Sequence, residues 1–275
     1  MSWRLGFLGA GVMAETMIAG VLSEGVVEPQ QVLASDPHGT RRSTLELRYR
    51  IATTSNNVDV VDSCDLIVLA VKPQSLSRVF SEVGGQVRGD AQVLSIVAGA
   101  SIASLRKGLL HPHVARAMPN LPCRIHKGVT VWTAAEGEAA ERIQKVLRGM
   151  GRAVYVDTER HVDRATAVSG TGPAIVAEFV KSMMEASTYI GMPRELGREA
   201  VLATLMGTVE MIERDEELHV AELIDRVTSP GGTTSRALQV LKRERVGAAV
   251  TESIDAAYQR TLELGNDLEQ QLDQG

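Results

Sequence analysis

Three small residues near the start of the chain have the spacing of a phosphate-binding turn. Gly9, Gly11 and Ala14 form a G-x-G-x-x-A pattern that follows a short apolar run and opens a helical pattern. The first glycine permits a tight turn, the second lets the backbone approach a pyrophosphate, and the small third residue lets helix and strand pack closely. The N–H groups and the dipole of the helix start attract the phosphates. The pattern therefore predicts a site for a dinucleotide.

An acidic residue follows at the distance expected for the ribose of such a dinucleotide. Asp36 ends the next apolar run and lies 22 residues after Ala14, close to the roughly 20 residues typical of a ribose-binding acid. A carboxylate there can bind both ribose hydroxyls of NADH but repels the 2′-phosphate of NADPH. Arg41 and Arg42 either offset that repulsion or form a solvated helix start. The predicted cofactor is NADPH or NADH, and Asp36 favours NADH.

Three later apolar runs end in residues that suit a binding crevice for the same dinucleotide. Ligands of open α/β sheets bind in a crevice at the carboxyl ends of the strands. One run ends in Ala70-Val71-Lys72-Pro73, which places a cation at the crevice and a proline in the first turn of a helix. Another ends in Ala98-Gly99, where small residues leave room for a ring, and a third ends in Met118-Pro119-Asn120. Lys72 alone is equally well explained as a surface lysine.

Two glycine-rich turns lie in the second half of the chain. Ser169-Gly170-Thr171-Gly172-Pro173 interrupts a helical pattern, as a kink or a cap does. Thr228-Ser229-Pro230-Gly231-Gly232-Thr233-Thr234 precedes another helical pattern. Its hydroxyls, glycines and helix start form a cradle that suits a substrate carboxylate. A capped helix start is an equally good alternative.

The sequence lacks the motifs of metal sites, P-loops and activated serine nucleophiles. The chain has no H-E-x-x-H, no clustered His/Cys set, no P-loop and no G-x-S-x-G, so neither a metal site nor an activated serine is predicted. Two cysteines, Cys64 and Cys123, are too few for a disulfide framework and predict buried, reduced thiols in a cytoplasmic protein. Hydride transfer from a nicotinamide is the chemistry that remains.

Alternating strands and helices must position the first group of residues. The predicted strands are Arg4–Leu8, Val32–Ser35, Asp65–Val71, Val93–Val97, Val114–Met118, Val129–Thr133 and Val154–Val156, and the predicted helices are Met13–Glu24, Thr40–Tyr49, Gln74–Gly84, Ile102–Gly108 and Glu136–Arg148. The run Leu66–Val71 is apolar on both faces, which suits a central strand of a parallel sheet. The alternation predicts an α/β, Rossmann-type dinucleotide-binding domain over residues 1–162.

Residues 163–275 carry no strand pattern and predict an all-α domain. Its predicted helices are Asp163–Ile190, Arg194–Arg214, Val220–Val227, Gly232–Arg243 and Val246–Leu264. The polar end Asp267–Gly275 is expected to fray. This part is short for a core of its own, so we expect it to bury its apolar faces against a second copy of itself.

Composition sets the remaining limits. The 275 residues are 44% hydrophobic and 23% charged, with a net charge of −5, which is typical of a globular protein. A mild negative charge does not attract nucleic acid or an anionic membrane. No apolar run is long enough for a membrane-spanning helix, and the apolar N-terminal run is too short and too rich in glycine for a signal peptide.

The motifs together resemble the pyrroline-5-carboxylate reductase family over nearly the whole chain. The matching segments are Gly9–Ala14, Ala70–Pro73, Ala98-Gly99, Met118–Asn120, Ser169–Pro173, Gly191–Pro193 and Val227–Thr234, of which the last is the most specific. The resemblance implies a Rossmann domain followed by an all-α dimerisation and substrate-binding domain. It implies a homodimer, which some members assemble further, and NAD(P)H-dependent reduction of L-1-pyrroline-5-carboxylate to L-proline, the last step of proline biosynthesis.

The resemblance also implies roles for individual residues. The implied cofactor contacts are Leu8, Gly9, Ala10, Gly11, Val12, Met13, Asp36, Asn57, Ala70, Val71, Lys72, Pro73 and Ala98. The implied substrate contacts are Ser229, Gly232, Thr233, Thr234, Asn120 and Glu217. Thr234 matches a threonine whose hydroxyl reaches the ring nitrogen of the substrate, and Thr234 and Lys72 are the candidate catalytic residues. The active site is expected between the cofactor of one subunit and the helical domain of its partner.

The chain departs from the family pattern at three positions. Many members carry Ser or an Asn-Arg pair at the position of Asp36 and favour NADPH, and the turn usually reads Ser-Gly-Ser-Gly-Pro-Ala followed by an aromatic residue. Here Thr171 and Ile175 replace the second serine and the aromatic residue. The first departure concerns the choice of cofactor, and the other two concern either the pocket for the substrate ring or the helix packing behind it.

Two other classes of protein share the scaffold. A β-hydroxyacid dehydrogenase uses a lysine about four residues after a Gly-x-Gly in the helical part, where this chain has Val176 and no lysine before Lys181. A non-catalytic nucleotide-binding relative is the other class, and the intact segment Ser229–Thr234 argues against it. Reduction of a related cyclic imine is a further alternative.

Overall fold

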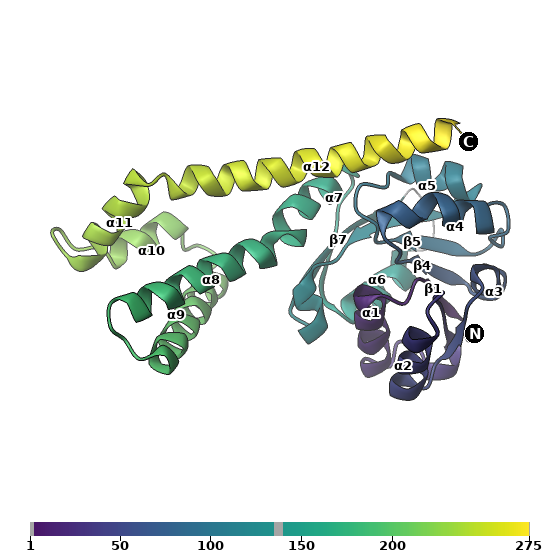
Figure 1. Ribbon diagram of the computed structural model, residues 1–275, viewed down its shortest axis with the longest axis horizontal. Helices are drawn as coiled ribbons and strands as arrows, with labels where there is room; N and C mark the ends of the chain where they lie inside the picture. Colours follow the sequence, from purple (N-terminus) through teal and green to yellow (C-terminus); the bar gives the residue numbers. More distant parts are fainter. Residues whose placement is uncertain (1–2, 135–139, 275) are drawn as a thin grey trace. The chain divides into compact units, whose positions relative to one another are not determined.

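A single sheet brings together the strand ends that carry the early motifs. The computed structural model describes residues 3–134 and 140–274 (Figure 1). Its strands are β1 (Leu5–Leu8), β2 (Val32–Ser35), β3 (Ala52–Thr54), β4 (Leu66–Leu69), β5 (Gln92–Ser95), β6 (Val114–Met118), β7 (Gly128–Ala134) and β8 (Gly151–Tyr155). Their order is β3-β2-β1-β4-β5-β6-β7-β8, and every neighbouring pair is parallel except β6 with β7. The order reverses between β1 and β4, where a crevice for a ligand forms at the strand ends.

Helices cover both faces of this sheet. They are α1 (Val12–Ser23), α2 (Gly39–Tyr49), α3 (Asn57–Ser63), α4 (Leu76–Val83), α5 (Ile102–Leu109), α6 (Ala140–Arg148) and α7 (Arg160–Ala165). On β4, Leu66 and Val68 pack in one core with residues of α1, α2 and α6, whereas Ile67 and Leu69 pack in a second core with residues of α3, α4 and α5. Successive strand residues point to opposite faces, so a strand covered on both sides is apolar throughout. The predicted α/β architecture is confirmed.

Two short elements between β2 and β4 are absent from the predicted set. Strand β3 has three residues and lies at the edge of the sheet. Helix α3 has seven residues and begins after Asn56, whose Oδ1 accepts a hydrogen bond from the N–H of Val58 at 3.1 Å. Neither element is long enough to show a periodic apolar pattern. The first residues of the predicted helix Glu136–Arg148 lie outside the described part of the chain, and α6 is its described remainder.

A buried arginine and two partly exposed carboxylates hold α7 against the sheet. Arg116 on β6 is 2% exposed and donates to Glu159 Oε1 at 2.8 Å and to Asp163 Oδ1 at 2.6 Å. Glu159 Oε1 also accepts a hydrogen bond from the N–H of Ile102 at 2.7 Å. Removing either carboxylate would destabilise this arrangement, because the buried guanidinium would lose part of its compensation. These contacts make the helical residues after 159 part of the sheet domain.

The last helix also contacts the sheet domain. Helix α12 (Val246–Gln274) includes all described residues of the polar end Asp267–Gly275, for which fraying is expected from the sequence, so that expectation is wrong for the described residues. Leu268 is 6% exposed and belongs to the core on the α3–α5 side. Gln271 Oε1 accepts a hydrogen bond from Ser77 Oγ at 2.8 Å. Contacts with residues nearly 200 positions earlier stabilise this polar end, and no local pattern indicates them.

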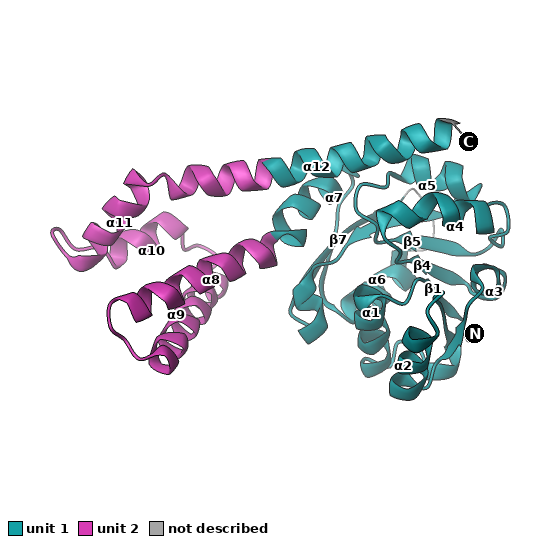
Figure 2. Cartoon of the chain, in the orientation of Figure 1, with its two compact units in different colours: residues 1–171, 256–275 teal, residues 172–255 magenta. Residues whose placement is uncertain are grey.

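Two compact units result from these contacts (Figure 2). One comprises residues 1–171 and 256–275, and the other comprises residues 172–255. The sequence places the domain boundary after residue 162 and assigns all later residues to the helical domain. The structure differs because the ion pairs of Arg116 retain α7 in the first unit, and because Leu268 and its neighbours on α12 pack there. The assignment of dimerisation and substrate binding to the helical domain stays a prediction.

The second unit is built from helices alone. It contains α8 (Gly172–Tyr189), α9 (Arg194–Arg214), α10 (Val220–Arg226), α11 (Thr233–Arg243) and the start of α12. None of the 18 residues of α8 and none of the 11 residues of α11 is buried. Met206 and Val209 on α9 are 72% and 61% exposed. Exposed apolar faces of this extent are typical of an interaction surface.

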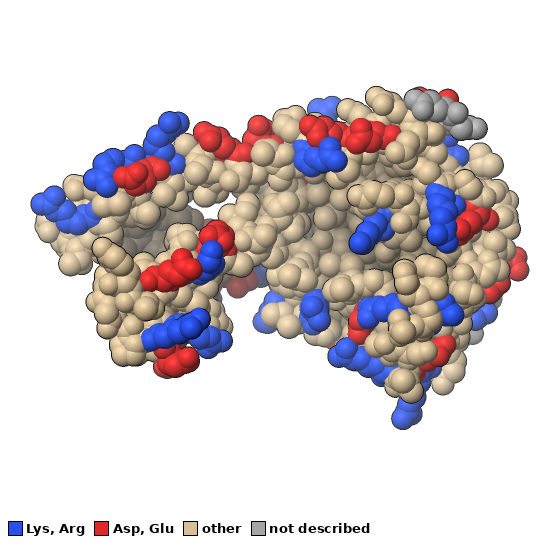
Figure 3. All heavy atoms as spheres, viewed as in Figure 1, with Lys and Arg blue, Asp and Glu red and all other residues tan. Residues whose placement is uncertain are grey.

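Charges on the face drawn in Figure 3 are mixed. Basic and acidic side chains lie interspersed there, and the visible face shows no continuous basic surface of the kind that binds nucleic acid. Among the described helices, none combines the length and the apolar character that a membrane crossing requires.

Candidate active site

The turn between β1 and α1 has the geometry that its glycines predict. Gly9 has φ of +93°, and a Cβ at this position would lie 2.8 Å from the carbonyl oxygen of Ala70. Only glycine fits this combination of backbone conformation and close approach. Ala14, the third small residue of the pattern, is fully buried. The turn therefore depends on its small residues for the reasons inferred from the sequence.

The start of α1 is open to a ligand. Gly11 precedes the first turn of this 12-residue helix, and no side chain caps that turn. A Cβ built on Gly11 meets no atom within 4 Å, so glycine is not required there by the protein itself. The N–H groups and the dipole of the helix start attract an anion. The residues therefore fit the pyrophosphate of a dinucleotide, which would occupy the space that a Cβ would fill.

Asp36 is fixed beside the turn as a carboxylate. Its Oδ2 accepts a hydrogen bond from the N–H of Ala10 at 3.0 Å, and its Oδ1 accepts one from the N–H of His38 at 2.9 Å. The ring Nδ1 of His38 lies 3.0 Å from the same Oδ1. Partial burial alone raises the pKa of Asp36, but the two N–H groups and His38 together lower it below its ordinary value. The carboxylate is therefore ionised at neutral pH, and it lines the pocket beside the turn.

The two arginines after Asp36 hold the backbone. Arg41 donates through Nε to the carbonyl of Ala10 and through Nη2 to that of Gly11, the latter at 3.2 Å, and Arg42 Nη1 donates to the carbonyl of Asp36 at 2.7 Å. The sequence left open whether these arginines offset the charge of Asp36 or form a solvated helix start. In the structure both guanidinium groups bind backbone carbonyl oxygens of the turn and of Asp36.

Glu15 supports the turn through Arg41. Its carboxylate pairs with Arg41 at 2.5 Å and Arg48 at 2.9 Å, and accepts a hydrogen bond from the hydroxyl of Tyr49 at 3.1 Å. Partial burial raises the pKa of Glu15, but Arg41 and the other partners lower it below its usual value. The glycine turn is thus held between Asp36, through the N–H of Ala10, and the pair Glu15–Arg41, through two carbonyl groups.

A pocket of about 300 Å³ opens beside this turn. Among the predicted cofactor contacts it is lined by Gly9, Gly11, Asp36, Asn57, Ala70, Val71 and Lys72. Asn57 is held in place because its Oδ1 accepts from Ser35 Oγ at 2.6 Å and its Nδ2 donates to Glu82 Oε2 at 2.5 Å. The ends of β1, β2 and β4 thus contribute to one pocket, as the strand order requires.

The remaining predicted cofactor contacts do not line this pocket. Leu8 and Ala10 are buried, so their side chains face the protein, whereas Val12 is 54% exposed and Met13 is half-buried. Pro73 begins the short helix Pro73–Ser75 that follows Lys72. Ala98 follows β5 and is half-buried.

Six further residues line the pocket and are not among the contacts predicted from the sequence. These are Ser35, Pro37, His38, Ser75, Arg78 and Val79. Arg78 pairs with Glu82 at 2.8 Å, and the two have the i,i+4 spacing of an ordinary surface ion pair. The sequence pattern therefore predicts a surface residue at position 78 and gives no sign of the pocket. His38 follows Asp36 by two residues, and proximity to that residue is a signal by which it could have been found.

The second group of predicted residues lies in the unit of residues 172–255. Gly232 precedes α11, and no side chain caps this helix. The N–H of Gly232 donates to the carbonyl of Ser229 at 3.0 Å, and a Cβ on Gly232 would lie 2.4 Å from Ser229 Oγ. Thr233 and Thr234 form the first turn of α11. One helix start thus combines free N–H groups with three hydroxyl-bearing residues, Ser229, Thr233 and Thr234, which suits a carboxylate.

The structure places the other predicted substrate contacts in different settings. Asn120 follows β6 and is 9% exposed, and its Oδ1 accepts a hydrogen bond from the N–H of Val129 at 3.0 Å. This bond fixes the start of β7, so the amide oxygen has a structural role. Glu217 is exposed in the loop between α9 and α10. The turn Ser169–Pro173 follows α7, and residues Thr166–Gly170 form a π-helical turn, a feature common at functional sites.

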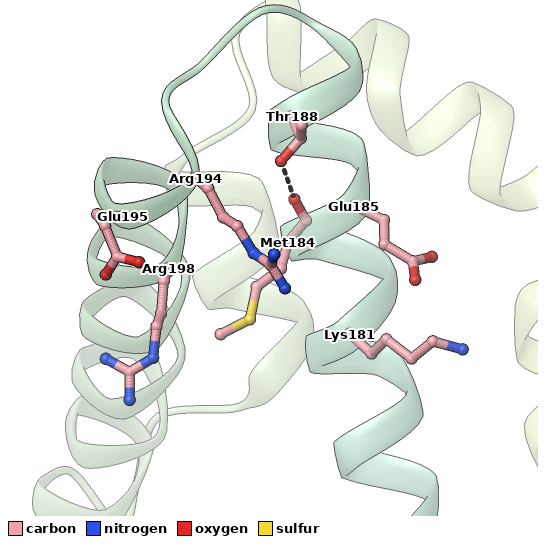
Figure 4. Close-up of a pocket in the computed structure, with 7 residues that line it drawn as sticks. All are labelled: Lys181, Met184, Glu185, Thr188, Arg194, Glu195 and Arg198. Atoms are coloured by element: carbon pink, nitrogen blue, oxygen red, sulfur yellow. Dashed lines mark hydrogen bonds between the residues drawn. The ribbon is translucent and has the colours of Figure 1, made fainter.

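A larger pocket of about 580 Å³ lies between α8 and α9 (Figure 4). It is lined by Lys181, Met184, Glu185, Thr188, Arg194, Glu195 and Arg198. Its charges are of both signs, and it contains none of the predicted cofactor or substrate contacts. The hydroxyl of Thr188 donates to the carbonyl of Met184 at 3.3 Å and is therefore occupied within α8. The candidate site remains the pocket beside the glycine turn.

Comparisons with known proteins match both parts of the chain. Residues 159–264 match the family model described as pyrroline-5-carboxylate reductase dimerisation, and residues 4–99 match the model described as NADP oxidoreductase coenzyme F420-dependent. The chain is 36% identical over 268 residues to a pyrroline-5-carboxylate reductase of Synechocystis sp., which covers 96% of this chain and 99% of that protein. It is 37% identical over 267 residues to pyrroline-5-carboxylate reductase 3 of Rattus norvegicus, with 95% and 96% covered.

Solved structures show the same relationship. The pyrroline carboxylate reductase of Plasmodium falciparum with NADP bound has a TM-score of 0.87 at 26% identity, covering 96% of this chain and 98% of that one. A pyrroline-5-carboxylate reductase of Coxiella burnetii has a TM-score of 0.83 at 26% identity, covering 96% and 99%.

The space at Gly11 gives a direct test of the cofactor site. We expect Gly11→Ala to fold normally, because its Cβ meets no protein atom, and to raise the Kd of the reduced cofactor by roughly tenfold or more, because the Cβ takes the space of the pyrophosphate. Fluorescence titration measures the Kd, and thermal unfolding measures the fold. The matched control is Gly89→Ala, which also adds a Cβ in open space. Unchanged binding in Gly11→Ala would place the pyrophosphate elsewhere.

Proposed function

The chain belongs to the pyrroline-5-carboxylate reductase family, and we propose that it reduces the C=N bond of L-1-pyrroline-5-carboxylate with NAD(P)H to form L-proline. The observation that carries the proposal is the uncapped start of α11, where the segment Ser229–Thr234 presents hydroxyls and N–H groups to a carboxylate. A dinucleotide pocket is common to many reductases. This second cradle is what favours a substrate that carries a carboxylate next to its reacting ring.

The residues of the chain bind and orient the substrate in this proposal. The N–H groups at the start of α11 and the hydroxyl of Ser229 hold the carboxylate. The hydroxyl of Thr234 forms a hydrogen bond at the ring nitrogen and favours its protonated form, which accepts a hydride far better than the neutral imine. When bound, the reduced nicotinamide supplies the hydride. Most of the rate enhancement then comes from positioning and from electrostatics.

Lys72 has a supporting role in the proposal. It is exposed at the end of β4 and lines the pocket beside Gly9 and Gly11. Its ammonium group places a positive charge near the bound dinucleotide and stabilises the negative phosphates. Asn120 and Glu217 are proposed as further substrate contacts on the family resemblance alone.

A homodimer is proposed as the functional unit. The support is that α8 and α11 bury none of their residues, although α8 carries Val176 and Phe179 at 58% and 47% exposure. A closed dimer covers such faces by repeating one surface on both subunits. We propose further that the Ser229–Thr234 turn of one subunit serves the cofactor of its partner. The proposed compartment is the cytoplasm, supported by two buried cysteines, Cys64 and Cys123, that are not joined in a disulfide.

NADH is proposed as the preferred cofactor. Asp36 is ionised and lines the pocket, and Arg41 and Arg42 are bound to backbone carbonyls rather than directed at a 2′-phosphate. The relative from Plasmodium falciparum was solved with NADP, so the preference is proposed for this chain and not for the family. Lys72 and Arg78 also line the pocket and are the cations that could meet a 2′-phosphate there.

The first test is the reaction itself. We expect the protein to oxidise NADH or NADPH in the presence of pyrroline-5-carboxylate, and we expect Thr234→Ala to lower kcat by roughly a hundredfold with an unchanged melting temperature, because one hydrogen bond at the reacting nitrogen is lost. Loss of absorbance of the reduced nicotinamide measures the rate. Thr208→Ala is the matched control, since the hydroxyl of Thr208 is bound to the carbonyl of Thr204 within α9. An active Thr234→Ala would remove that residue from the mechanism, and an inactive wild type that binds cofactor would favour a different imine.

A mixing experiment tests the sharing of the site between subunits. If the turn of one subunit serves the cofactor of the other, an equal mixture of Gly11→Ala and Thr234→Ala chains is exchanged by reversible unfolding and assayed at a cofactor concentration that leaves Gly11→Ala alone nearly inactive. The mixture then regains about a quarter of wild-type activity. Half of the dimers are then hybrids, and one of the two sites in each hybrid is intact. Each variant refolded alone is the control. A mixture no more active than its components would place both residues of a site on the same chain.

The charge of Asp36 predicts how the cofactor preference changes. We expect Asp36→Asn to raise the ratio of kcat/KM for NADPH to that for NADH by roughly tenfold, because it removes a negative charge beside the 2′-phosphate at nearly constant shape. Parallel assays with both cofactors measure the ratio. Asp59→Asn is the control, because Asp59 is an acid of the same unit that does not line the pocket. An unchanged ratio would assign the preference to other residues.

A further inference from the structure

The loop that follows β5 lies against the backbone of α12. Gly99 has φ of +77°, and a Cβ on it would lie 2.9 Å from Leu264 Cβ and 3.0 Å from the carbonyl oxygen of Thr261. At Gly265, a Cβ would lie 2.8 Å from the carbonyl oxygen of Gly99. Each glycine thus makes room for the other segment. Glycine weakens the interior of a helix, so its presence at position 265 needs a cause, and this close contact is one.

Polar and apolar contacts fix α12 at this place. Glu269 Oε1 accepts hydrogen bonds from the hydroxyls of Ser101 and Ser104, both at 3.3 Å. One turn later Asp273 pairs with Lys107 on α5. Leu268 is buried in the core on the same side. Figure 1 shows the last turns of α12 beside α5, the helix that the loop of Gly99 leads into.

This loop carries Ala98, the proposed cofactor contact that lies apart from the glycine turn. Ala98 directly precedes Gly99 and follows β5, which pairs with β4, whose end leads to Ala70 and Lys72 in the cofactor pocket. None of the residues described for α12 lines that pocket. A dinucleotide bound by its pyrophosphate at Gly11 extends past the ends of neighbouring strands, which brings its nicotinamide end to the loop of Ala98.

We infer that α12 positions the Ala98-Gly99 loop, and through it the nicotinamide end of the cofactor, with Gly265 as the positioning residue. The inference rests on the proposed function, because it takes the dinucleotide site as given. A methyl group on Gly265 would force either the carbonyl of Gly99 or the helix to move. Hydride transfer depends steeply on geometry, and a displacement of about 1 Å can lower the rate by roughly a hundredfold.

The test separates the two ends of the cofactor. For Gly265→Ala we expect kcat to fall by roughly tenfold or more and the affinity for NADH to fall, while the affinity for ADP-ribose, which lacks the nicotinamide, stays at the wild-type value. Gly247→Ala is the matched control, because it adds a methyl group to the same helix where no atom lies within 4 Å. Asp273→Asn breaks an exposed contact of α12 without touching the loop of Gly99 and reports on simple loosening of the helix.

Three results would overturn the inference. The first is a Gly265→Ala variant with the kcat and the NADH affinity of the wild type. The second is a Gly265→Ala variant that loses affinity for NADH and for ADP-ribose equally. The third is an Asp273→Asn variant with the same fall in kcat and in NADH affinity as Gly265→Ala. The Gly11→Ala variant separates failure of this inference from failure of the proposed function, because it should weaken the binding of NADH and of ADP-ribose alike. If the wild type binds neither compound, or if Gly11→Ala binds both normally, the proposed cofactor site itself is wrong.

Discussion

The contact between the glycine turn and the end of β4 is the constraint on which the first unit depends. Gly9 passes so close to the carbonyl of Ala70 that no side chain fits between them, and this approach brings α1 to the carboxyl ends of β1 and β4. The turn is then held from both sides, by Asp36 through the N–H of Ala10 and by Arg41 through two carbonyl groups. A turn held this firmly needs little rearrangement when a pyrophosphate binds, so more of the binding energy is retained.

Much of this could be predicted because it is local in the sequence. The apolar run of β4 is buried on both faces, and that burial is visible in residue types alone. The spacing of Gly9, Gly11 and Ala14 similarly reflects one turn and the helix directly after it. Arg41 could not be assigned in this way. Its side chain reaches from α2 back to a turn 30 residues earlier. From the sequence alone, an arginine near a helix start is explained equally well as a solvated side chain.

Other features escaped prediction because single long-range contacts decide them. Helix α7 belongs with the sheet because of the ion pairs of one buried residue, Arg116. The polar end of α12 stays helical because Leu268 enters a core formed more than 150 residues earlier. Arg78 lines the cofactor pocket although its pair with Glu82 has the spacing of an ordinary solvated helix. In each case the local pattern is accurate, but the partner that determines the outcome lies elsewhere in the chain.

Glycine shows most clearly why sequence and structure must be combined. The chain has 25 glycines, and at two of these positions glycine is favoured for opposite reasons. At Gly11 the missing Cβ leaves a space that no protein atom fills, whereas at Gly265 the corresponding space is taken by the carbonyl of Gly99. The first glycine therefore indicates a ligand and the second a contact within the protein. We expect a methyl group at either position to impair cofactor binding or turnover, so loss of activity alone cannot separate these roles, whereas the atoms around each missing Cβ can.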